Sequence, residues 1–269
     1  MSNKTQILKV GGSLLTDKFA AEPEFRWQNA RRLAAEICEL TALPILVHGT
    51  GSYGKPPAKK YGYLDGFLSR DQANVVSAVS GMLEELRQNV IDAFRDAGLS
   101  VVGLSAGSLF MTRNGEIVNC AWQSVLSFVE RGIIPIISGD FVVDLEQDFA
   151  VCSSDWIASH LAVSARAKRL VFATDVPGVI MPDWARSSKE ICSSDYALLH
   201  SALRDCQDDV SHGMDGKLKA GFWAGEHDVE VHIIDGTVPG NVMRALTEDC
   251  PQSTRLVSLK SKQLAHDTH

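Results

Sequence analysis

The sequence predicts an α/β fold, a three-layer αβα sandwich around a mostly parallel central sheet. The first observation is that short runs rich in β-branched residues alternate with amphipathic stretches. Strands that are joined through helices lie parallel in a sheet that is covered on both faces. The second observation is the length of the chain. The chain has 269 residues, of which 45% are hydrophobic, so it is long enough to bury one large core.

The strand-like runs and the helical stretches follow one another along the chain. Six short runs have the length and composition of buried strands: residues 7–10, 44–47, 100–104, 133–137, 169–173 and 229–234. Residues 25–41 and 70–97 instead repeat apolar side chains every three or four positions, as Val75, Val79, Met82, Leu86, Val90 and Phe94 do in the second stretch. This spacing predicts two amphipathic helices.

Two insertions and two polar stretches interrupt this order. Residues 109–120 predict a hairpin around Asn114-Gly115, and residues 141–151 predict another around Glu146-Gln147-Asp148. Residues 182–209 are polar and predict a weak helix or a surface excursion. We expect residues 253–269 to form a C-terminal tail that is frayed past Lys262.

Charge and cysteine usage narrow the function. Lys and Arg number 26 against 33 Asp and Glu, and the net charge of −7 disfavours nucleic acid and anionic membranes as partners. A small anionic substrate remains compatible, because a few lysines in a cleft can outweigh a diffuse negative surface. The six cysteines show no C-x-x-C spacing and predict small, buried, free thiols. The N-terminus turns polar too soon for a signal-peptide core, which favours the cytoplasm.

Ligands of an open parallel sheet bind beyond the carboxyl ends of its strands, so a binding site is expected where the strands end. The first strand ends in Gly11-Gly12-Ser13, which lies between Lys9 and Lys18. Two glycines let backbone N–H groups turn toward an anion, and the two lysines place positive charge beside them. A tight turn flanked by solvated lysines explains this segment equally well.

The second strand exit is also rich in glycine. It reads His48-Gly49-Thr50-Gly51-Ser52-Tyr53-Gly54-Lys55. Such a loop lets a phosphate approach the backbone closely, and Lys55 can reach into it. We interpret His48 as a packed residue at the strand end. Two glycine-rich loops at successive strand exits indicate an anion site more strongly than either does alone.

Other strand exits and helix starts carry weaker signals. Asp140 in Ser138-Gly139-Asp140 and Asp175 each follow a buried strand, where an aspartate is most often a turn cap. Ser153-Ser154-Asp155 precedes the apolar helix predicted over residues 156–165 and is at least its N-cap, although it can also hold an anion. Gly213-Met214-Asp215-Gly216-Lys217 opens a helix predicted over residues 218–225, where Lys217 either faces a phosphate or is solvated.

Together these segments resemble the amino acid kinase family over residues 7–246. The start Lys-x-Gly-Gly-Ser, the Thr16-Asp17-Lys18 segment and the loop HGTGSYGKPPAKKYG are most similar to the isopentenyl phosphate kinases, and next to the fosfomycin kinases. FATDVPGV and GMDGK resemble the nucleotide-binding segments of the family. The resemblance implies a central sheet of about eight strands and one domain over residues 1–252. Its acceptor side is residues 1–165 and its nucleotide side residues 166–252.

The resemblance also implies an ATP-dependent kinase that uses Mg²⁺ and transfers a phosphoryl group to a small phosphate monoester. The implied catalytic residues are Lys9, Lys18 and Lys217. The implied nucleotide-binding residues are Gly11, Gly12, Ser13, Gly51, Asp175, Gly213 and Lys217. The implied acceptor-binding residues are Thr50, Lys55 and Ser154, and no residue stands out as a metal ligand. A homodimer is expected, as is common in the family, with residues 25–41 and 70–97 as candidate surfaces.

Three positions depart from the family pattern. Lys55 replaces the histidine that holds the acceptor phosphate or phosphonate, Pro177 replaces the second aspartate of T-D-V-D-G, and Ser154 replaces the glycine of S-G-D. The paired serines are closer to the fosfomycin-type pattern, so a phosphonate remains the alternative acceptor. A nucleotide- or anion-storage module without catalysis is the alternative from another class.

Overall fold

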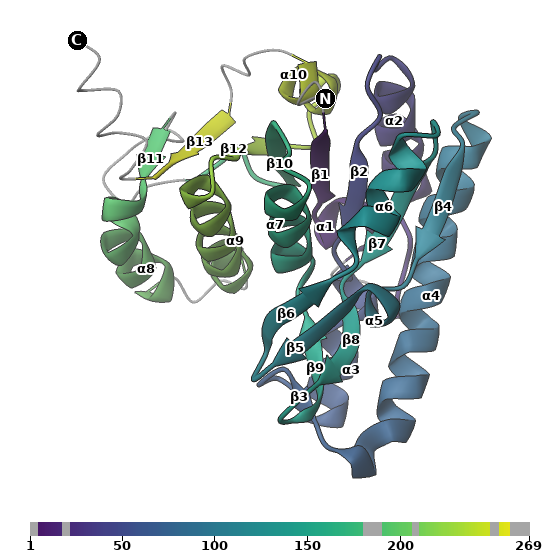
Figure 1. Cartoon of the computed structure of the whole chain (residues 1–269), viewed down its shortest axis with the longest axis vertical. Coiled ribbons are helices and arrows are strands. Elements are labelled where there is room, and N and C mark those ends of the chain that lie inside the picture. The colour runs from purple at the N-terminus through teal and green to yellow at the C-terminus, as the bar shows by residue number, and fades with distance from the viewer. Residues whose placement is uncertain (1–4, 18–21, 180–189, 206–209, 248–252, 259–269) are drawn as a thin grey trace.

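The computed structural model describes residues 5–17, 22–179, 190–205, 210–247 and 253–258, and within them an eight-stranded sheet in the order β11-β13-β12-β10-β1-β2-β7-β4 (Figure 1). Its strands are β1 (Gln6–Val10), β2 (Ile45–His48), β4 (Val101–Leu104), β7 (Ile134–Ser138), β10 (Arg169–Thr174), β11 (Glu190–Cys192), β12 (Glu230–Asp235) and β13 (Ser253–Val257). The six strands from β12 to β4 are parallel, and β13 is antiparallel to β12. The predicted fold class is confirmed.

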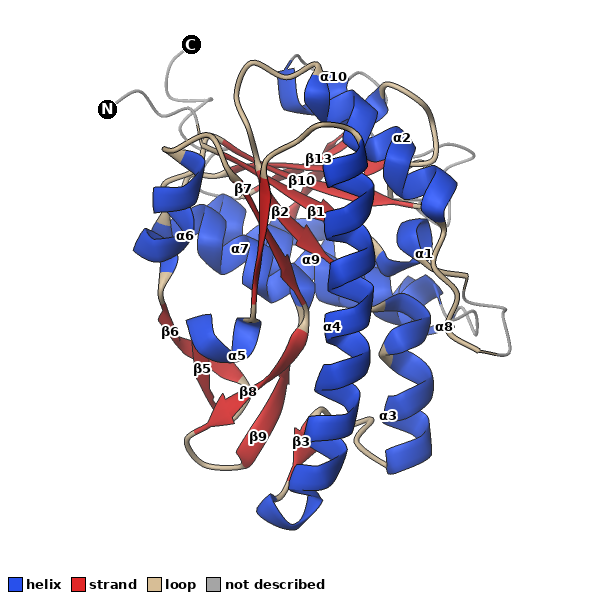
Figure 2. Cartoon of the chain, turned by 90° about the vertical axis from the view of Figure 1, so that its right-hand side faces the viewer, coloured by secondary structure: helices blue, strands red, loops and turns tan. Residues whose placement is uncertain are grey.

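Helices cover both faces of this sheet (Figure 2). One layer contains α1 (Gly12–Leu15), α2 (Trp27–Cys38), α4 (Ala73–Asp96) and α10 (Asn241–Thr247), and the other contains α6 (Trp122–Val129), α7 (Ser154–Ser164), α8 (Tyr196–Asp205) and α9 (Val210–Glu226). Successive residues of a strand point to opposite faces, so Leu8 lies in the core with α2 and α4, whereas Ile7 lies in the core with α7 and α9. The next residue on the Ile7 face is Lys9.

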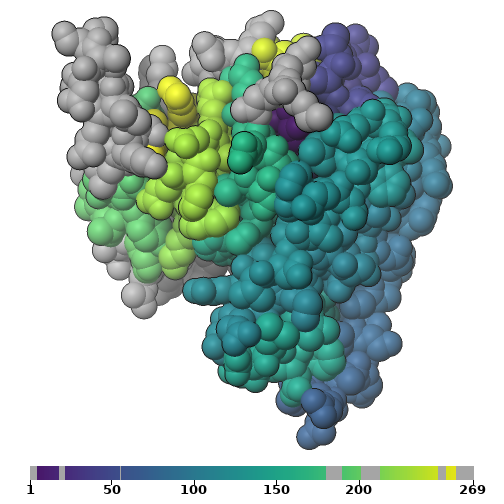
Figure 3. All heavy atoms as spheres, in the orientation of Figure 1, coloured from purple at the N-terminus to yellow at the C-terminus, as the bar shows by residue number. Residues whose placement is uncertain are grey.

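A second sheet of five strands stands at the carboxyl end of the parallel strands and projects from the body of the molecule (Figure 3). It contains β3 (Phe67–Leu68), β9 (Asp148–Cys152), β8 (Asp140–Asp144), β5 (Phe110–Arg113) and β6 (Glu116–Cys120) in that order. Both predicted hairpins are confirmed, since β5 pairs antiparallel with β6 and β8 with β9. The short helix α5 (Ala106–Leu109) packs against β8 and β5 of this sheet, and the short helix α3 (Lys55–Tyr61) precedes β3 in the chain.

The structure corrects three predicted boundaries. Ser253–Val257 is the strand β13 of the main sheet and not the start of a tail, and Leu256 packs in the core; the frayed end past Lys262 lies outside the described residues. Residues 182–209 predict a weak helix or a surface excursion; α8 confirms a helix over Tyr196–Asp205, but Glu190–Cys192 is a strand. β11 has only three residues and β13 contains three polar ones, so neither shows the apolar run that indicated the other strands. Helix α9 begins at Val210, so the Gly213 to Lys217 segment lies within the helix and does not precede it.

The cysteine prediction is partly confirmed. In the described part of the chain Cys38, Cys120, Cys152 and Cys192 are all free thiols, and Cys152 and Cys192 are buried. Cys38 is exposed at the end of α2, contrary to the expectation of burial. Among the helices that the structure describes, none is both long and apolar enough to cross a membrane.

Candidate active site

The two glycine loops touch each other at the carboxyl ends of β1 and β2. A Cβ atom on Gly12 would lie 2.3 Å from the backbone nitrogen of Gly51, which is closer than any real contact. Gly51 has φ +49°, and a Cβ there would meet the Thr16 hydroxyl at 1.9 Å. Thr16 Oγ1 accepts from the Ser52 N–H at 3.0 Å and donates to the Gly12 carbonyl at 2.9 Å. The loops therefore form one backbone-lined floor held by one threonine.

Two lysines from distant parts of the chain share one buried carboxylate beside this floor. Lys9 Nζ and Lys217 Nζ each lie 2.9 Å from Asp155 Oδ1. Lys9 reaches it because the alternation of β1 directs its side chain toward the α7 layer, and Asp155 stands in the first turn of α7. The Lys217 ammonium also lies 4.9 Å from the centre of the Phe172 ring. Two ammonium groups against one carboxylate leave a net positive charge that attracts anions.

The titration of this cluster follows from burial and charge. Burial by itself would raise the pKa of Asp155, but the charges of Lys217 and Lys9 outweigh burial and hold that pKa at about 2. The pKa of Lys217 is lowered to about 8, because burial and the charge of Lys9 together outweigh the opposing effect of Asp155. The carboxylate is therefore ionised at neutral pH, and Lys217 is charged up to about pH 8.

A pocket of about 330 Å³ lies over the floor and the lysines, and we call it the lysine pocket. It is lined by Lys9, Gly11, Gly12, Ser13, Thr50, Gly51, Ser52, Pro56, Asp155, Thr174, Asp175, Val176, Gly213, Met214 and Lys217. Residues of five separate segments of the chain therefore meet in one place. The Gly11 N–H is donated to the Ala173 carbonyl at 2.8 Å, so Gly11 gives the pocket room rather than a donor.

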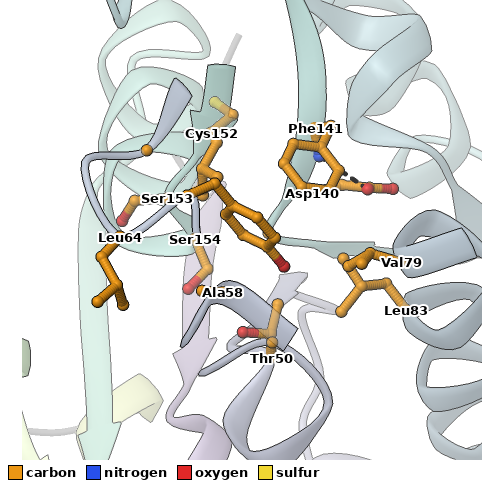
Figure 4. Close-up of a pocket in the computed structure, with 15 residues that line it drawn as sticks. Thr50, Ala58, Leu64, Val79, Leu83, Asp140, Phe141, Cys152, Ser153 and Ser154 are labelled. Atoms are coloured by element: carbon orange, nitrogen blue, oxygen red, sulfur yellow. Dashed lines mark hydrogen bonds between the residues drawn. The ribbon is translucent and has the colours of Figure 1, made fainter. Parts of the chain in front are cut away.

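A second pocket of about 280 Å³ adjoins the first, and we call it the apolar pocket. It is lined by Thr50, Gly54, Ala58, Tyr63, Leu64, Gly66, Val79, Leu83, Gly139, Asp140, Phe141, Val151, Cys152, Ser153 and Ser154. Val79 and Leu83 of α4 stand on one side of this pocket, and Cys152, Ser153 and Ser154 lie across from them (Figure 4). Thr50 lines both pockets, which places the boundary between them at the second glycine loop.

The structure brings most of the predicted site residues together. Lys9, Gly11, Gly12, Ser13, Thr50, Gly51, Asp175, Gly213 and Lys217 all line the lysine pocket. Ser154 lines the apolar pocket beside Thr50. Lys18 lies outside the described residues, and Lys55 is placed only as the first residue of α3, because its side chain is not among those described. Their roles stay predictions.

Two minor sequence predictions are also decided. His48 is fully buried at the end of β2, where its Nδ1 lies 3.1 Å from the Gly49 carbonyl, so the packed interpretation is confirmed. Burial lowers the pKa of His48 to about 4. Ser153 caps α7 as expected, since its hydroxyl accepts from the Asp155 N–H at 3.3 Å.

Three residues of the site gave too weak a signal in the sequence. Asp155 was interpreted as part of a helix cap, yet it organises both lysines. Thr16 joins the two loops through contacts 36 and 4 residues away, which no local pattern reveals. Tyr63 lines the apolar pocket from a segment that carried no motif. An aspartate ahead of an apolar helix was the only available signal among the three.

The fold and this site define an α/β protein with two glycine-rich loops at the carboxyl ends of parallel strands, beside a cluster of two lysines and one aspartate. Residues 4–235 match the model of the amino acid kinase family. The chain belongs to the amino acid kinase family, as its motifs predict.

Relatives that match over most of their length include two kinds of kinase. The isopentenyl phosphate kinase of Methanothermobacter thermautotrophicus is 28% identical over 93% of this chain and 98% of its own. The acetylglutamate kinase of a Synechococcus strain is 26% identical over 93% of this chain and 82% of its own. A solved isopentenyl phosphate kinase structure superposes with a TM-score of 0.78 at 28% identity, covering 94% of this chain and 98% of that one.

Proposed function

We propose that this member of the amino acid kinase family is an ATP-dependent kinase for a small phosphate monoester. Its reaction is then isopentenyl phosphate plus ATP to isopentenyl diphosphate plus ADP, as the names of several relatives suggest. A structure with that enzyme's substrate bound shares the fold, with a TM-score of 0.73 at 22% identity.

The observation that carries the proposal is the junction of two unlike pockets at Thr50. The lysine pocket has the positive charge and backbone lining that a polyphosphate needs. The apolar pocket has the size and lining for a short hydrocarbon tail. A phosphate monoester whose tail fills the apolar pocket has its phosphate at the boundary, beside the group to be transferred.

Phosphoryl transfer needs alignment and neutralisation of charge rather than covalent help from the protein. In this proposal Lys9 contacts the transferring phosphoryl group and Lys217 holds the β- or γ-phosphate, both oriented by Asp155. Lys18 stabilises the transition-state charge. The N–H groups of Gly12, Ser13 and Gly51 hold phosphate oxygens, while Gly11, Gly213 and Asp175 shape the nucleotide side. Thr50, Lys55 and Ser154 bind the acceptor. Because its phosphate oxygen is already ionised, no general base is needed.

The residues of the lysine pocket do not build a magnesium site. Within the described residues there is no cluster of at least three metal-ligating side chains, and the Asp155 carboxylate is engaged by two ammonium groups. We therefore expect Mg²⁺ to arrive with the phosphates of ATP, and none of the protein's steps above depends on it.

The acceptor is tested by an ATP-consumption screen. It compares isopentenyl phosphate, dimethylallyl phosphate, fosfomycin, small phosphonates and amino-acid carboxylates, each with Mg²⁺ and ATP. We expect ADP release with the two alkyl phosphates, because the lining of the apolar pocket is mostly hydrocarbon. Preference for fosfomycin would support the phosphonate alternative. Tight ATP binding without ADP release in the presence of any acceptor would contradict the kinase proposal and support a storage module instead.

The proposed enzyme is a homodimer, as is common in its family. The long helix α4 and its neighbour α2 pack against each other and present the candidate surface. Light scattering at micromolar concentration that gives a mass near 29 kDa would reject the dimer.

A further inference from the structure

One hydroxyl in the wall of the apolar pocket has no hydrogen-bond partner. Tyr63 lines this pocket and is only 4% exposed. Its Oη atom is shielded from water, and no donor or acceptor in the described part of the chain contacts it. The Tyr63 backbone, by contrast, is tied down, because its N–H donates to the Ala58 carbonyl at 3.0 Å. The backbone of Tyr63 is therefore held in place, while the polar end of its side chain is unpaired.

A buried hydroxyl without a partner destabilises the folded protein, and native proteins pair nearly all such groups. An unpaired hydroxyl in a pocket wall indicates that an atom of a bound ligand pairs with it. Burial, helped by Tyr61, raises the pKa of Tyr63 to about 12, so the hydroxyl keeps its proton and remains able to donate. When an acceptor oxygen pairs with the Tyr63 hydroxyl, the free-energy cost of the unpaired hydroxyl is removed, and this gain adds to the binding energy of the acceptor.

The neighbouring side chains leave this role to Tyr63. Its ring packs edge-on against Phe141, with ring centres 5.2 Å apart, and shares one apolar cluster with Val79 and Leu83. The other buried polar group of the wall, Asp140, is already engaged, since its Oδ1 accepts from Ser80 Oγ at 3.0 Å and from the Phe141 N–H at 2.7 Å. Figure 4 shows the Asp140 carboxylate next to α4, on the same side of the pocket as Val79.

We propose that Tyr63 is a specificity-determining residue whose hydroxyl donates a hydrogen bond to an oxygen atom that the acceptor carries into the apolar pocket. That oxygen belongs either to the acceptor phosphate or to a hydroxyl on the acceptor tail. The inference rests on the proposed function, since it assigns the apolar pocket to the acceptor. It distinguishes this pocket from a purely hydrocarbon one, in which phenylalanine would serve equally well.

The test compares Tyr63→Phe with the wild-type protein on two acceptors of one carbon skeleton, isopentenyl phosphate and 3-hydroxy-3-methylbutyl phosphate. The substitution removes only the hydroxyl and keeps the ring on Phe141. We expect the KM for an acceptor that bonds Tyr63 to rise about 10-fold or more, while the KM for ATP stays unchanged. Tyr61→Phe is the matched control, because Tyr61 lies on the same segment and does not line the pocket.

Each outcome decides the proposal. A rise for both acceptors identifies the phosphate oxygen, and a rise only for the hydroxylated acceptor identifies the tail oxygen. An unchanged KM for both, with an unchanged melting temperature, would overturn the role of Tyr63. If the wild-type protein phosphorylates neither acceptor, the proposed function fails instead. Calorimetric binding of the two acceptors to wild type and Tyr63→Phe then decides the role of Tyr63 separately.

Discussion

The two pockets that meet at Thr50 differ in the groups that line them and in the segments that supply these groups. The lysine pocket is made of backbone and short side chains from loops that directly follow parallel strands, with charge from Lys9 and Lys217. The apolar pocket is made of side chains from α3, α4 and the small sheet, which are separated in the chain by up to about a hundred residues. The first arrangement suits the phosphates that every substrate of such a kinase shares. The second suits the part of the acceptor that differs between substrates, so changes in the two pockets should have separable effects.

The largest effect should come from Asp155→Asn, which removes the charge that holds both lysines. Leaving two buried ammonium groups without a counter-charge should destabilise the protein by about 3–5 kcal/mol. We expect kcat to fall by about 10²–10³, since the lysines lose the orientation that transfer requires. Urea unfolding and steady-state kinetics measure both quantities. A variant with normal kcat would show that the contact of Asp155 with the two lysines serves stability alone and not transfer.

Gly12→Ala should have the next largest effect, because it distorts the floor of the lysine pocket. The added methyl group would lie 2.3 Å from the Gly51 nitrogen and must push the two loops apart, at a cost of about 1–3 kcal/mol. We expect the KM for ATP to rise while acceptor binding, measured by calorimetry without ATP, changes little. Gly81→Ala is the matched control. A Cβ atom at this exposed position in α4 meets nothing within 4 Å, so the change should stabilise the helix by about 0.5–1 kcal/mol.

The contrast between the pockets also explains how much the sequence could predict. The lysine pocket follows from motifs at strand exits, where Gly11-Gly12-Ser13, Thr50-Gly51 and Lys217 each carry a local signal. The apolar pocket does not, because Tyr63, Phe141 and Val151 lie far apart in the chain and meet only through the pairing of β3 with β9 and of β8 with β9. Strands β11 and β13 were missed for a related reason. β11 has only three residues and β13 contains three polar ones, so neither shows the apolar run that indicated the central strands, and their place in the sheet depends on pairing with distant segments.

Titration of Lys217 should give the lysine pocket its own pH dependence. Because the pKa of Lys217 is lowered from 10.5 to about 8, kcat/KM for ATP should fall about tenfold per pH unit above pH 8, as the free enzyme loses this charge. The unfolded chain binds this proton up to pH 10.5, so the same group makes the folded state more stable as pH rises from 8 to 10.5.

Lys217→Arg should separate these two effects. Arginine stays charged throughout this range, so the alkaline limb of the pH–rate profile should move beyond pH 10 or disappear. An alkaline limb that remains near pH 8 in this variant would assign the titration to another group.

Substitutions at Lys55 test whether this residue binds the acceptor phosphate at the boundary between the two pockets. If the Lys55 ammonium binds the acceptor phosphate, Lys55→Ala should raise the acceptor KM by about 10-fold or more and leave the KM for ATP unchanged. Lys55→His should shift preference toward acceptors of the isopentenyl or fosfomycin type, because a neutral imidazole favours an acceptor with less negative charge than a lysine does. Unchanged acceptor kinetics in both variants would leave the backbone of the glycine loop as the acceptor site.

The smallest effect should come from Asp144, which acts on the apolar pocket from a distance. Its carboxylate accepts hydrogen bonds from the N–H groups of Asn114, Gly115, Glu146 and Gln147 at 2.8–3.1 Å, and so ties the turns of the two hairpins together. Burial would raise the pKa of Asp144, but these bonds hold it well below the usual range. The stabilisation is therefore present above about pH 4, where the unfolded carboxyl ionises, and is lost as pH falls below that value.

Asp144→Asn should remove part of that network and cost about 1–3 kcal/mol of stability at neutral pH. Because Phe141 and Val151 of the same hairpin line the apolar pocket, the KM for the acceptor should rise severalfold, whereas the KM for ATP should not change. The difference in stability between variant and wild type should shrink as pH falls toward the acid range, which thermal melts at several pH values measure. An equal rise in both KM values would show that the two pockets are coupled through the small sheet, contrary to the separation argued above.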